Sequence, residues 1–385
     1  MPASTQHGVT TTTPVATAPH EGSVPSDSAP LDVLVIGAGQ AGLALAWHLN
    51  RQGARYLLVD AATALGHSWR SRWDSLRLFT PAQYDSLPGI PFPAPLDTYP
   101  TKDQVADYLT GYANTHDVPV QTGTRVTRLQ SRRDGHFVAH TTQGQLTATQ
   151  VVIATGAFHK PHNPTIDGAF GPDVQQLHSS QYRNPASVPK GRVLVVGAGN
   201  SGLQIAEELN ADCGVVVAAG TRPASLPQRF AGRDLFWWLL KLGLMDKSPD
   251  SALARRVRAR GDLVIGTDRR QMAREGVDFR GRLVATAGRT ATFADGTTTE
   301  VDAVVWATGF KPDFTWIEAD VTTADGYIRH RDGRTDVPGL WVLGQPWQRT
   351  RGSSLLGFVE RDAERISDEL VLSSPSKSDP VSTGR

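Results

Sequence analysis

Two glycine clusters with the same spacing are the residues of this sequence best suited to binding chemistry. The first is Gly37-Ala-Gly-Gln-Ala-Gly42 and the second is Gly197-Ala-Gly-Asn-Ser-Gly202. In such a cluster the first glycine permits a tight turn, the second lets a pyrophosphate approach the backbone, and the third allows close packing of helix on strand. The phosphates then lie at a helix N-terminus, where free N–H groups favour anions. The sequence therefore predicts two dinucleotide sites.

The residues that follow each cluster differ in charge. Asp60 ends the strand after the first cluster, and an acid about 20 residues past the glycines is the expected partner of ribose hydroxyls. The matching position after the second cluster is Gly220, followed by Thr221 and Arg222. Without a carboxylate there, a 2′-phosphate is accepted, and Arg222 can pair with it, which predicts NADPH over NADH. The alternative is that Arg222 caps a strand end or meets an acid.

The elements that position these residues are predicted by apolar runs. Strands are expected at 31–36, 55–59, 191–196 and 214–219, with helices at 43–49 and 203–209. Strand 150–154 ends in Thr155-Gly156 and strand 301–306 ends in Ala307-Thr308-Gly309, and we expect both to return to the first sheet. Residues 338–344 and a helix to about Leu370 would complete that sheet's domain.

This order predicts an α/β protein with two Rossmann-like domains, the second inserted into the first. Because the N-terminal fold of two-dinucleotide flavoproteins usually holds FAD, we expect an FAD domain at 31–160 and 300–372 and an NADPH domain at 161–299. Segments 1–30 and 373–385 are poor in large apolar side chains, so we expect them to be disordered.

Composition excludes several classes of function. The 385 residues carry a net charge of +1, which gives no reason to expect a nucleic-acid partner. No apolar run approaches the roughly 18–20 residues of a membrane span, and no secretory signal is recognised, so a cytoplasmic location is expected. The single cysteine, Cys213, is expected to be a small core residue, and it excludes an internal disulfide or a redox-active cysteine pair.

With thiol reductases excluded, the chain resembles the class B flavin-containing monooxygenases, in particular small bacterial members similar to plant indole-pyruvate monooxygenases. The resemblance rests on both glycine clusters and on the segment from Phe170 to Tyr182, which keeps the HxxxY half of the family's FxGxxxHxxxY pattern. Phe170-Gly171 is out of register with that pattern, because the spacing to His178 is one residue longer. Related Baeyer–Villiger enzymes carry Trp at the position of Tyr182.

Further segments carry the same resemblance. His67–Trp73 and Ser75–Pro81 resemble the stretch that lies along the FAD ribose and isoalloxazine, and Asp302–Phe310 resembles the ATG-type motif. The resemblance implies that NADPH reduces FAD, that a C4a-(hydro)peroxyflavin forms with dioxygen, and that it oxygenates a small sulfur or nitrogen nucleophile or an activated carbonyl. The expected partners are thus a small-molecule substrate and dioxygen, with a homodimer expected by analogy.

The site residues follow from the motifs and the resemblance. Catalytic candidates are Thr80, which falls near the polar residue that the family places over the flavin, His178 and Tyr182. Cofactor contacts are expected from Gly37, Gly39, Gln40, Ala41, Gly42, Asp60, Trp69, Arg70, Val126, Ala154, Thr155, Gly156, Gly197, Gly199, Asn200, Ser201, Gly202, Arg222, Ala307, Thr308, Gly309 and Gly344.

Alternatives stay open for several of these residues and for the activity. Trp69 and Trp73 also suit a plain core, Arg70 a surface cation, and His178 a buried linker histidine. The aromatic segment 230–244 is predicted to form an apolar helix. Three roles are open for it: lining a substrate channel, resting on a membrane surface, or packing onto its own domain. A flavin NADPH oxidase or reductase that passes electrons to dioxygen or a partner protein is the rival function, and a flavin-binding sensor without turnover is another.

Overall fold

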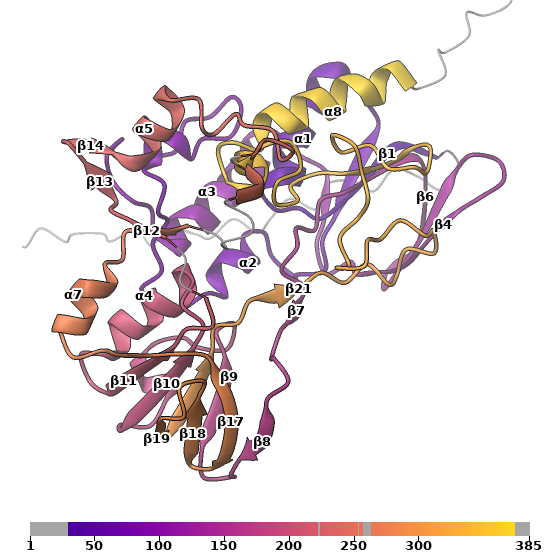
Figure 1. Cartoon of the computed structure of the whole chain (residues 1–385). Coiled ribbons are helices and arrows are strands. Elements are labelled where there is room, and N and C mark those ends of the chain that lie inside the picture. The colour runs from indigo at the N-terminus through magenta and orange to yellow at the C-terminus, as the bar shows by residue number, and fades with distance from the viewer. Residues whose placement is uncertain (1–29, 222–223, 253, 257–262, 374–385) are drawn as a thin grey trace, which may run out of the picture.

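The computed structural model describes residues 30–221, 224–252, 254–256 and 263–373. Apart from their residues Pro30 and Ser373, the two terminal segments expected to be disordered lie outside this range, as does Arg222. The chain forms two lobes, which lie one above the other in the view of Figure 1.

The first lobe is a seven-stranded sheet covered by helices. Its strand order is β3-β2-β1-β6-β5-β4, and β22 pairs in parallel with β6. The strands β1, β2, β3, β6 and β22 run parallel, whereas β4, β5 and β6 form an antiparallel meander. The elements are β1 (Leu31–Ile36), α1 (Gln40–Gln52), β2 (Tyr56–Val59), α2 (His67–Arg70), α3 (Lys102–Thr115), β3 (Val120–Gln121), β4 (Val126–Ser131), β5 (Phe137–Thr141), β6 (Gly144–Ile153), β22 (Leu340–Val342) and α8 (Glu360–Ser373).

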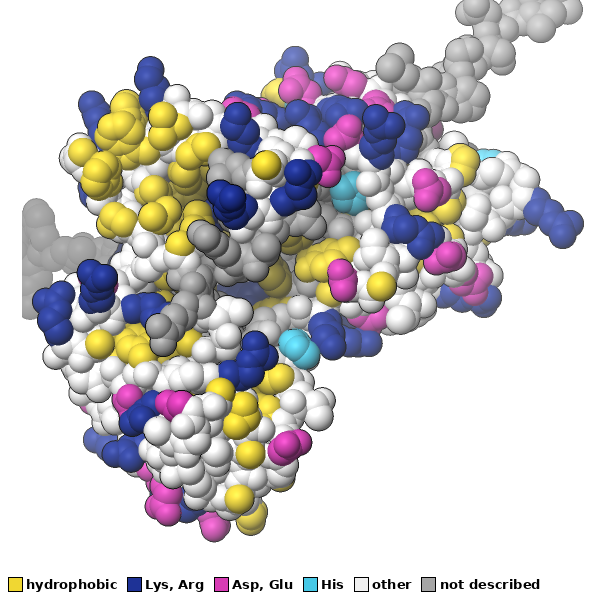
Figure 2. Space-filling view, in the orientation of Figure 1, with side chains coloured by type: hydrophobic (Ala, Val, Ile, Leu, Met, Phe, Trp, Pro, Cys, Tyr) yellow, Lys and Arg dark blue, Asp and Glu magenta, His cyan; other side chains and the backbone are white. Residues whose placement is uncertain are grey.

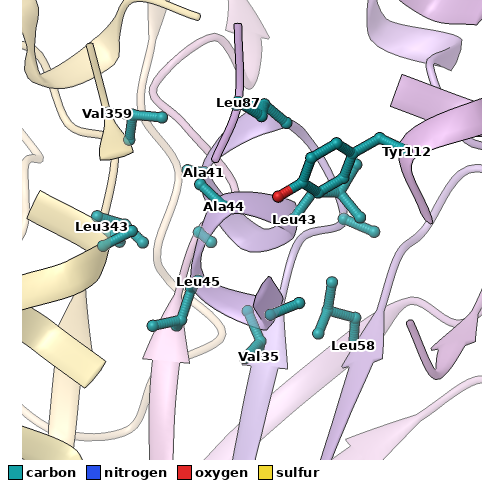
Figure 3. Close-up of a cluster of buried hydrophobic side chains, with 14 of the residues drawn as sticks. Val35, Ala41, Leu43, Ala44, Leu45, Leu58, Leu87, Tyr112, Leu343 and Val359 are labelled. Carbon is teal, nitrogen blue, oxygen red and sulfur yellow. The ribbon is translucent and has the colours of Figure 1, made fainter. Parts of the chain in front are cut away.

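Helix α1 is the centre of this lobe's core. Leu43, Ala44 and Leu45 are fully buried, because α1 is covered by the sheet on one side and by α3 and α8 on others. Figure 3 shows Leu87 and Tyr112 on one flank of the helix, and Leu343 and Val359 on another. Chain segments from both ends of the sequence therefore bury the helix that begins at the first glycine cluster.

The second lobe contains a five-stranded parallel sheet and a four-stranded sheet packed against it. The strand orders are β16-β11-β10-β20-β9 and β19-β18-β17-β8. The elements are β8 (Asp167–Phe170), β9 (Gln175–His178), β10 (Arg192–Val196), α4 (Asn200–Leu209), β11 (Gly214–Ala218), α7 (Arg269–Arg274), β16 (Asp278–Arg280), β17 (Leu283–Gly288), β18 (Thr290–Phe293), β19 (Thr298–Glu300) and β20 (Ala303–Trp306).

The expectation that strand 301–306 returns to the first sheet is wrong. Strand β20 pairs in parallel with β10 and with β9, so it belongs to the second lobe. All four of its residues are buried, and an apolar strand of this kind suits the interior of either sheet, so its sequence does not specify which one it joins. The second sheet thus extends beyond residue 299, as far as Trp306.

Two short strands connect the lobes. Strand β7 (Lys160–Pro161) pairs antiparallel with β21 (Phe310–Lys311), so the segment that first enters the second lobe and the segment that finally leaves it lie side by side. Figure 1 shows this pair between the lobes. The backbone N–H of His162 donates to the Gly309 carbonyl at 2.9 Å, which extends the pairing toward the ATG turn.

A long excursion leaves the second lobe after β11 and packs on the first. Its described elements are β12 (Ser225–Leu226), β13 (Arg229–Phe230), β14 (Arg233–Asp234), α5 (Leu235–Lys241) and β15 (Val264–Ile265). The aromatic segment is therefore a hairpin followed by a seven-residue helix. The helix begins after Asp234, whose side chain caps it by accepting from the Phe236 N–H. Phe236 packs against Phe79 and Phe358 of the first lobe.

Candidate functional site

The first glycine cluster has the geometry that a dinucleotide requires. A side chain at Gly42 would meet the Gly37 carbonyl at 2.1 Å, and one at Gly37, where φ is +111°, would meet the Ala154 carbonyl at 2.5 Å. A side chain at Gly39 would meet nothing within 4 Å. Gly37 and Gly42 thus serve the packing of the turn, whereas the space beside Gly39 is open for a phosphate.

The first turn of α1 is free to receive an anion. Among the residues that the structure describes, no side chain caps the helix, and its first turn carries no acid. Asp60 lies beside this turn and accepts from the backbone N–H groups of Ala38 and Ala62, each at 2.8 Å. A Cβ at Gly344, which has positive φ, would approach Ala41 at 2.9 Å, so the segment after β22 closes directly over the helix N-terminus. These residues fit the pyrophosphate and ribose of FAD.

The second cluster repeats this geometry. A side chain at Gly202 would meet the Gly197 carbonyl at 2.0 Å, and one at Gly197 would meet the Ala307 carbonyl at 2.3 Å, whereas no described residue lies within 4 Å of a Cβ placed on Gly199. In the described part of the chain, helix α4 also lacks a side-chain cap, and its first turn carries no acid. Asn200 holds the excursion here, since its side chain bonds the Leu263 carbonyl and the Ile265 N–H.

A residue that the sequence reasoning missed lies at the end of β11. The Arg282 guanidinium carbon is 3.4 Å from the position of a Cβ on Gly220, and a guanidinium nitrogen is 3.5 Å from the Gly220 carbonyl oxygen. Arg282 is exposed, and no ion pair is found for it within the described part of the chain. Its neighbour Arg280 is paired with Asp278. Arg282 therefore supplies a positive charge where a 2′-phosphate is expected.

One cavity joins the two glycine clusters. It is lined by Gln40 of the first cluster, by Asn200 and Ser201 of the second, and by Gln204, Trp69, Trp73, Leu76, Arg77, Leu78, Phe79, Thr80, Ser354, Leu355 and Leu356. The Gln40 side chain connects its walls: its nitrogen donates to the Ser354 carbonyl at 3.3 Å, and its oxygen accepts from the Trp69 indole at 3.4 Å. Both clusters thus open onto one largely apolar chamber.

Thr80 lines this cavity and is bonded to a carboxyl behind it. The Thr80 hydroxyl oxygen lies 2.5 Å from Oδ1 of Asp85, and both residues are buried. Burial and, to a smaller extent, the charge of Asp234 raise the pKa of Asp85, the hydrogen bond with Thr80 opposes them, and together they bring it to about 7. The sequence predicts Thr80 as a site residue but not Asp85. The signal that could have indicated Asp85 is its position five residues after Thr80.

His178 and Tyr182 lie outside the cavity lining. The His178 ring contacts the Gly309 carbonyl through Nε2 at 2.9 Å and the Ser180 N–H through Nδ1 at 3.1 Å, and burial lowers its pKa. The Tyr182 hydroxyl is fully buried and donates to Glu208 on α4 at 2.8 Å. His178 at the end of β9 thus contacts the turn that contains Gly309, and Tyr182 connects the loop after β9 to α4.

The other predicted residues are divided between the site and its surroundings. Arg70 points away from the chamber and pairs with Asp107 on the surface at 2.6 Å, while Val126 begins the outer strand β4. Thr155 contacts the His159 ring at 3.2 Å, and the Thr308 hydroxyl donates to the His162 carbonyl. Both strand ends, with Ala154 and Ala307 against the first glycines, thus lie under the two clusters.

Within the described ranges, no group of three or more His, Cys, Asp or Glu side chains is placed to hold a metal ion. In those same ranges no helix combines the length and apolar character that a membrane crossing requires. Cys213 is a free, partly buried thiol that packs against the core of the second lobe, as the sequence predicts.

Comparison with known proteins decides the family. The profile of the pyridine nucleotide-disulphide oxidoreductases matches residues 34–229. A CzcO-like oxidoreductase of Geobacillus kaustophilus is 40% identical over 89% of this chain and 98% of its own length. A solved flavin-containing monooxygenase from Stenotrophomonas maltophilia is 29% identical with a TM-score of 0.76, covering 89% of this chain and 98% of that one. The chain belongs to the flavin monooxygenases of this oxidoreductase family.

As a flavin monooxygenase, the chain uses FAD and NADPH, in agreement with its two glycine clusters. The indole-3-pyruvate monooxygenase YUCCA4 of rice is a more distant relative, 26% identical over 87% of this chain and 84% of its own length. The fold with two dinucleotide-binding lobes is the one expected from the sequence. A small-molecule substrate and dioxygen are the reactants of the enzyme.

Proposed function

We propose that this flavin monooxygenase acts on a small, largely apolar molecule that carries a sulfur or nitrogen nucleophile or an activated carbonyl. The observation that supports the proposal is the wall of the chamber between the two glycine clusters. Half of the lining residues are apolar, and they supply most of the exposed wall: Trp69, Trp73, Leu76, Leu78, Phe79, Leu355 and Leu356.

The chain's own residues bind, orient and shield the reactants. When bound, FAD supplies the activation of dioxygen with electrons from NADPH. The N-termini of α1 and α4 would bind the two pyrophosphates beside Gly39 and Gly199, which brings both cofactors to one chamber. Gln40 would orient the first cofactor, since it is held between Trp69 and Ser354. The excursion would exclude water by covering Phe79 and Leu355.

One charged side chain favours a particular member of the substrate class. Arg77 lines the chamber, and its guanidinium donates to the Tyr99 carbonyl at 3.2 Å, which leaves other N–H groups for a ligand. A guanidinium binds carboxylates well. The relation to an indole-3-pyruvate monooxygenase agrees with this, so an aromatic 2-oxo acid is the activated carbonyl that we would test first.

Product analysis with a small panel of probes tests the proposal. The purified enzyme with FAD is given NADPH, air and either thioanisole, N,N-dimethylaniline or indole-3-pyruvate. We expect at least one probe to yield an oxygenated product in step with NADPH consumption. If every probe leaves hydrogen peroxide equal to the NADPH consumed, this substrate class is wrong, and the oxidase alternative gains support.

Location and assembly are part of the same proposal. We propose a cytoplasmic enzyme, in keeping with a chain whose single cysteine cannot form an internal disulfide. We also propose a homodimer, which light scattering on the FAD-loaded protein tests directly, since a monomer mass across the working concentration range contradicts it.

A further inference from the structure

A buried carboxyl stands directly behind the wall of the reaction chamber. Asp85 follows the short 3₁₀ turn Ala82–Tyr84 and is 1% exposed. Its Oδ1 lies 2.5 Å from the hydroxyl oxygen of Thr80, which lines the chamber. Its Oδ2 is buried and has no hydrogen-bond partner within the described part of the chain. The carboxyl therefore reaches the chamber through one contact, the Thr80 hydroxyl.

The surroundings of Asp85 disfavour a negative charge. The segment around Gly357 packs against its backbone and has no titratable side chain between Leu355 and Val359. The charged group that acts on its carboxyl is Asp234 of the excursion, which is itself acidic, while Asp85 in turn raises the pKa of Tyr108 on α3. Burial, opposed by the Thr80 hydrogen bond and reinforced by Asp234, raises the pKa of Asp85 to about 7. Both protonation states are thus accessible near neutral pH.

The contact with Thr80 has a different direction in each state. A hydroxyl carries one proton, and a contact of 2.5 Å between two oxygens requires a proton between them. When Asp85 is ionised, Thr80 must donate to it, and the chamber then meets only the lone pairs of the hydroxyl. When Asp85 is protonated, the acid donates to Thr80, and the proton of Thr80 is free to point into the chamber.

We propose that Asp85 is a positioning residue that sets whether Thr80 donates or accepts a hydrogen bond in the reaction chamber. Reduction of dioxygen places an electron-rich oxygen group there, and a donating hydroxyl holds such a group more firmly than an accepting one. Protonated Asp85 therefore retains the oxygen in the chamber, and ionised Asp85 releases it as hydrogen peroxide. The inference depends on the monooxygenase activity, and it is independent of the substrate class proposed above.

A single-turnover measurement without substrate tests this role. The FAD-loaded enzyme is reduced with one equivalent of NADPH and mixed with aerated buffer, and the rate of hydrogen peroxide release is followed between about pH 6 and pH 8. In the unaltered enzyme we expect the rate to rise by about two- to tenfold as the pH passes 7, the factor that one hydrogen bond supplies. In Asp85→Asn, which does not ionise, we expect this step to be absent.

Variants of Thr80 distinguish positioning from a merely structural role. Thr80→Val keeps the carboxyl but removes the hydroxyl, so peroxide release should be fast at every pH. Thr80→Ser restores the hydroxyl and should restore the step. The absorbance of bound flavin verifies that each variant is folded. If Asp85→Asn loses its flavin, the comparison of Thr80→Val with Thr80→Ser tests the proposal instead. A pH step that survives in Asp85→Asn or in Thr80→Val, or that is missing from the unaltered enzyme, overturns the proposal.

Discussion

Arg282 is the residue from which we expect the clearest effect on cofactor choice. Its guanidinium lies beside Gly220, at the strand end where NADH-dependent enzymes place an acid. We predict that Arg282→Ala raises the KM for NADPH by about tenfold, because a charge-assisted contact to the 2′-phosphate is lost, and leaves the KM for NADH unchanged. Steady-state NAD(P)H oxidation measures both constants.

The neighbouring arginine provides the matched control. Arg280 carries the same charge but is bonded to Asp278, so Arg280→Ala should leave the preference for NADPH in place. Equal losses with NADPH and NADH in Arg282→Ala would contradict the assignment. The sequence pointed to the absence of an acid at Gly220, but Arg282 lies 62 residues further along the chain, and only the folded sheet brings them together.

At the scale of the element, two glycines at the N-terminus of α4 have different roles. Gly199 is expected to leave room for the phosphate, and Gly202 is needed for packing of the turn. Gly199 has a φ of −81°, and no described residue lies within 4 Å of a Cβ placed on it, whereas a Cβ on Gly202 would collide with the Gly197 backbone. We predict that Gly199→Ala folds normally and keeps its FAD, but raises the KM for NADPH by at least about tenfold, since the methyl group occupies the phosphate's approach.

Gly202→Ala is the contrasting variant. It should lower the melting temperature, because the backbone at 2.0 Å must shift, as well as weaken NADPH binding. Thermal unfolding and flavin content, measured beside the kinetics, separate the two outcomes. A loss of flavin or stability in Gly199→Ala equal to that in Gly202→Ala would show that the open space beside Gly199 is not a cofactor site.

The helices and strands also show which parts of the fold can be predicted from periodicity and motif spacing. The strand–glycine–helix units were predicted because the glycines, the apolar strands and Asp60 lie within short stretches of chain, where local geometry dominates. The sheet that β20 joins was not predictable in this way, because partner choice depends on contacts with distant strands. The hairpin before α5 was also missed, since its two-residue strands are too short to show an alternating pattern.

At the scale of the whole molecule, the excursion fastens the second lobe onto the first. The Tyr99 hydroxyl donates to Asp234 at 2.7 Å, the Gln228 amide donates to the Phe79 carbonyl at 2.6 Å, and Arg361 pairs with Asp246 at 2.6 Å. Figure 2 shows hydrophobic side chains on the outer face of α5 and the β13–β14 hairpin, where Phe230 is 62% exposed. The inner face, in contrast, is buried against the chamber wall.

Phe236 on that inner face carries our prediction for the molecule as a whole. It is 1% exposed and stacks on Phe79 of the chamber wall with ring centroids 6.0 Å apart. Removing such a buried ring costs about 3–5 kcal/mol, which should loosen the excursion from the first lobe. In Phe236→Ala we expect faster proteolysis within the excursion and more hydrogen peroxide per NADPH, because water then reaches the chamber.

Phe230→Ala removes the same ring from the exposed face of the same excursion and should change stability by no more than about 0.5 kcal/mol. Proteolysis and peroxide yield in this variant should therefore match those of the unaltered enzyme. If both phenylalanine variants leak peroxide equally, exclusion of water does not depend on the contact between excursion and wall. If Phe236→Ala is cut faster but its peroxide yield stays low, the excursion stabilises the molecule without sealing the chamber.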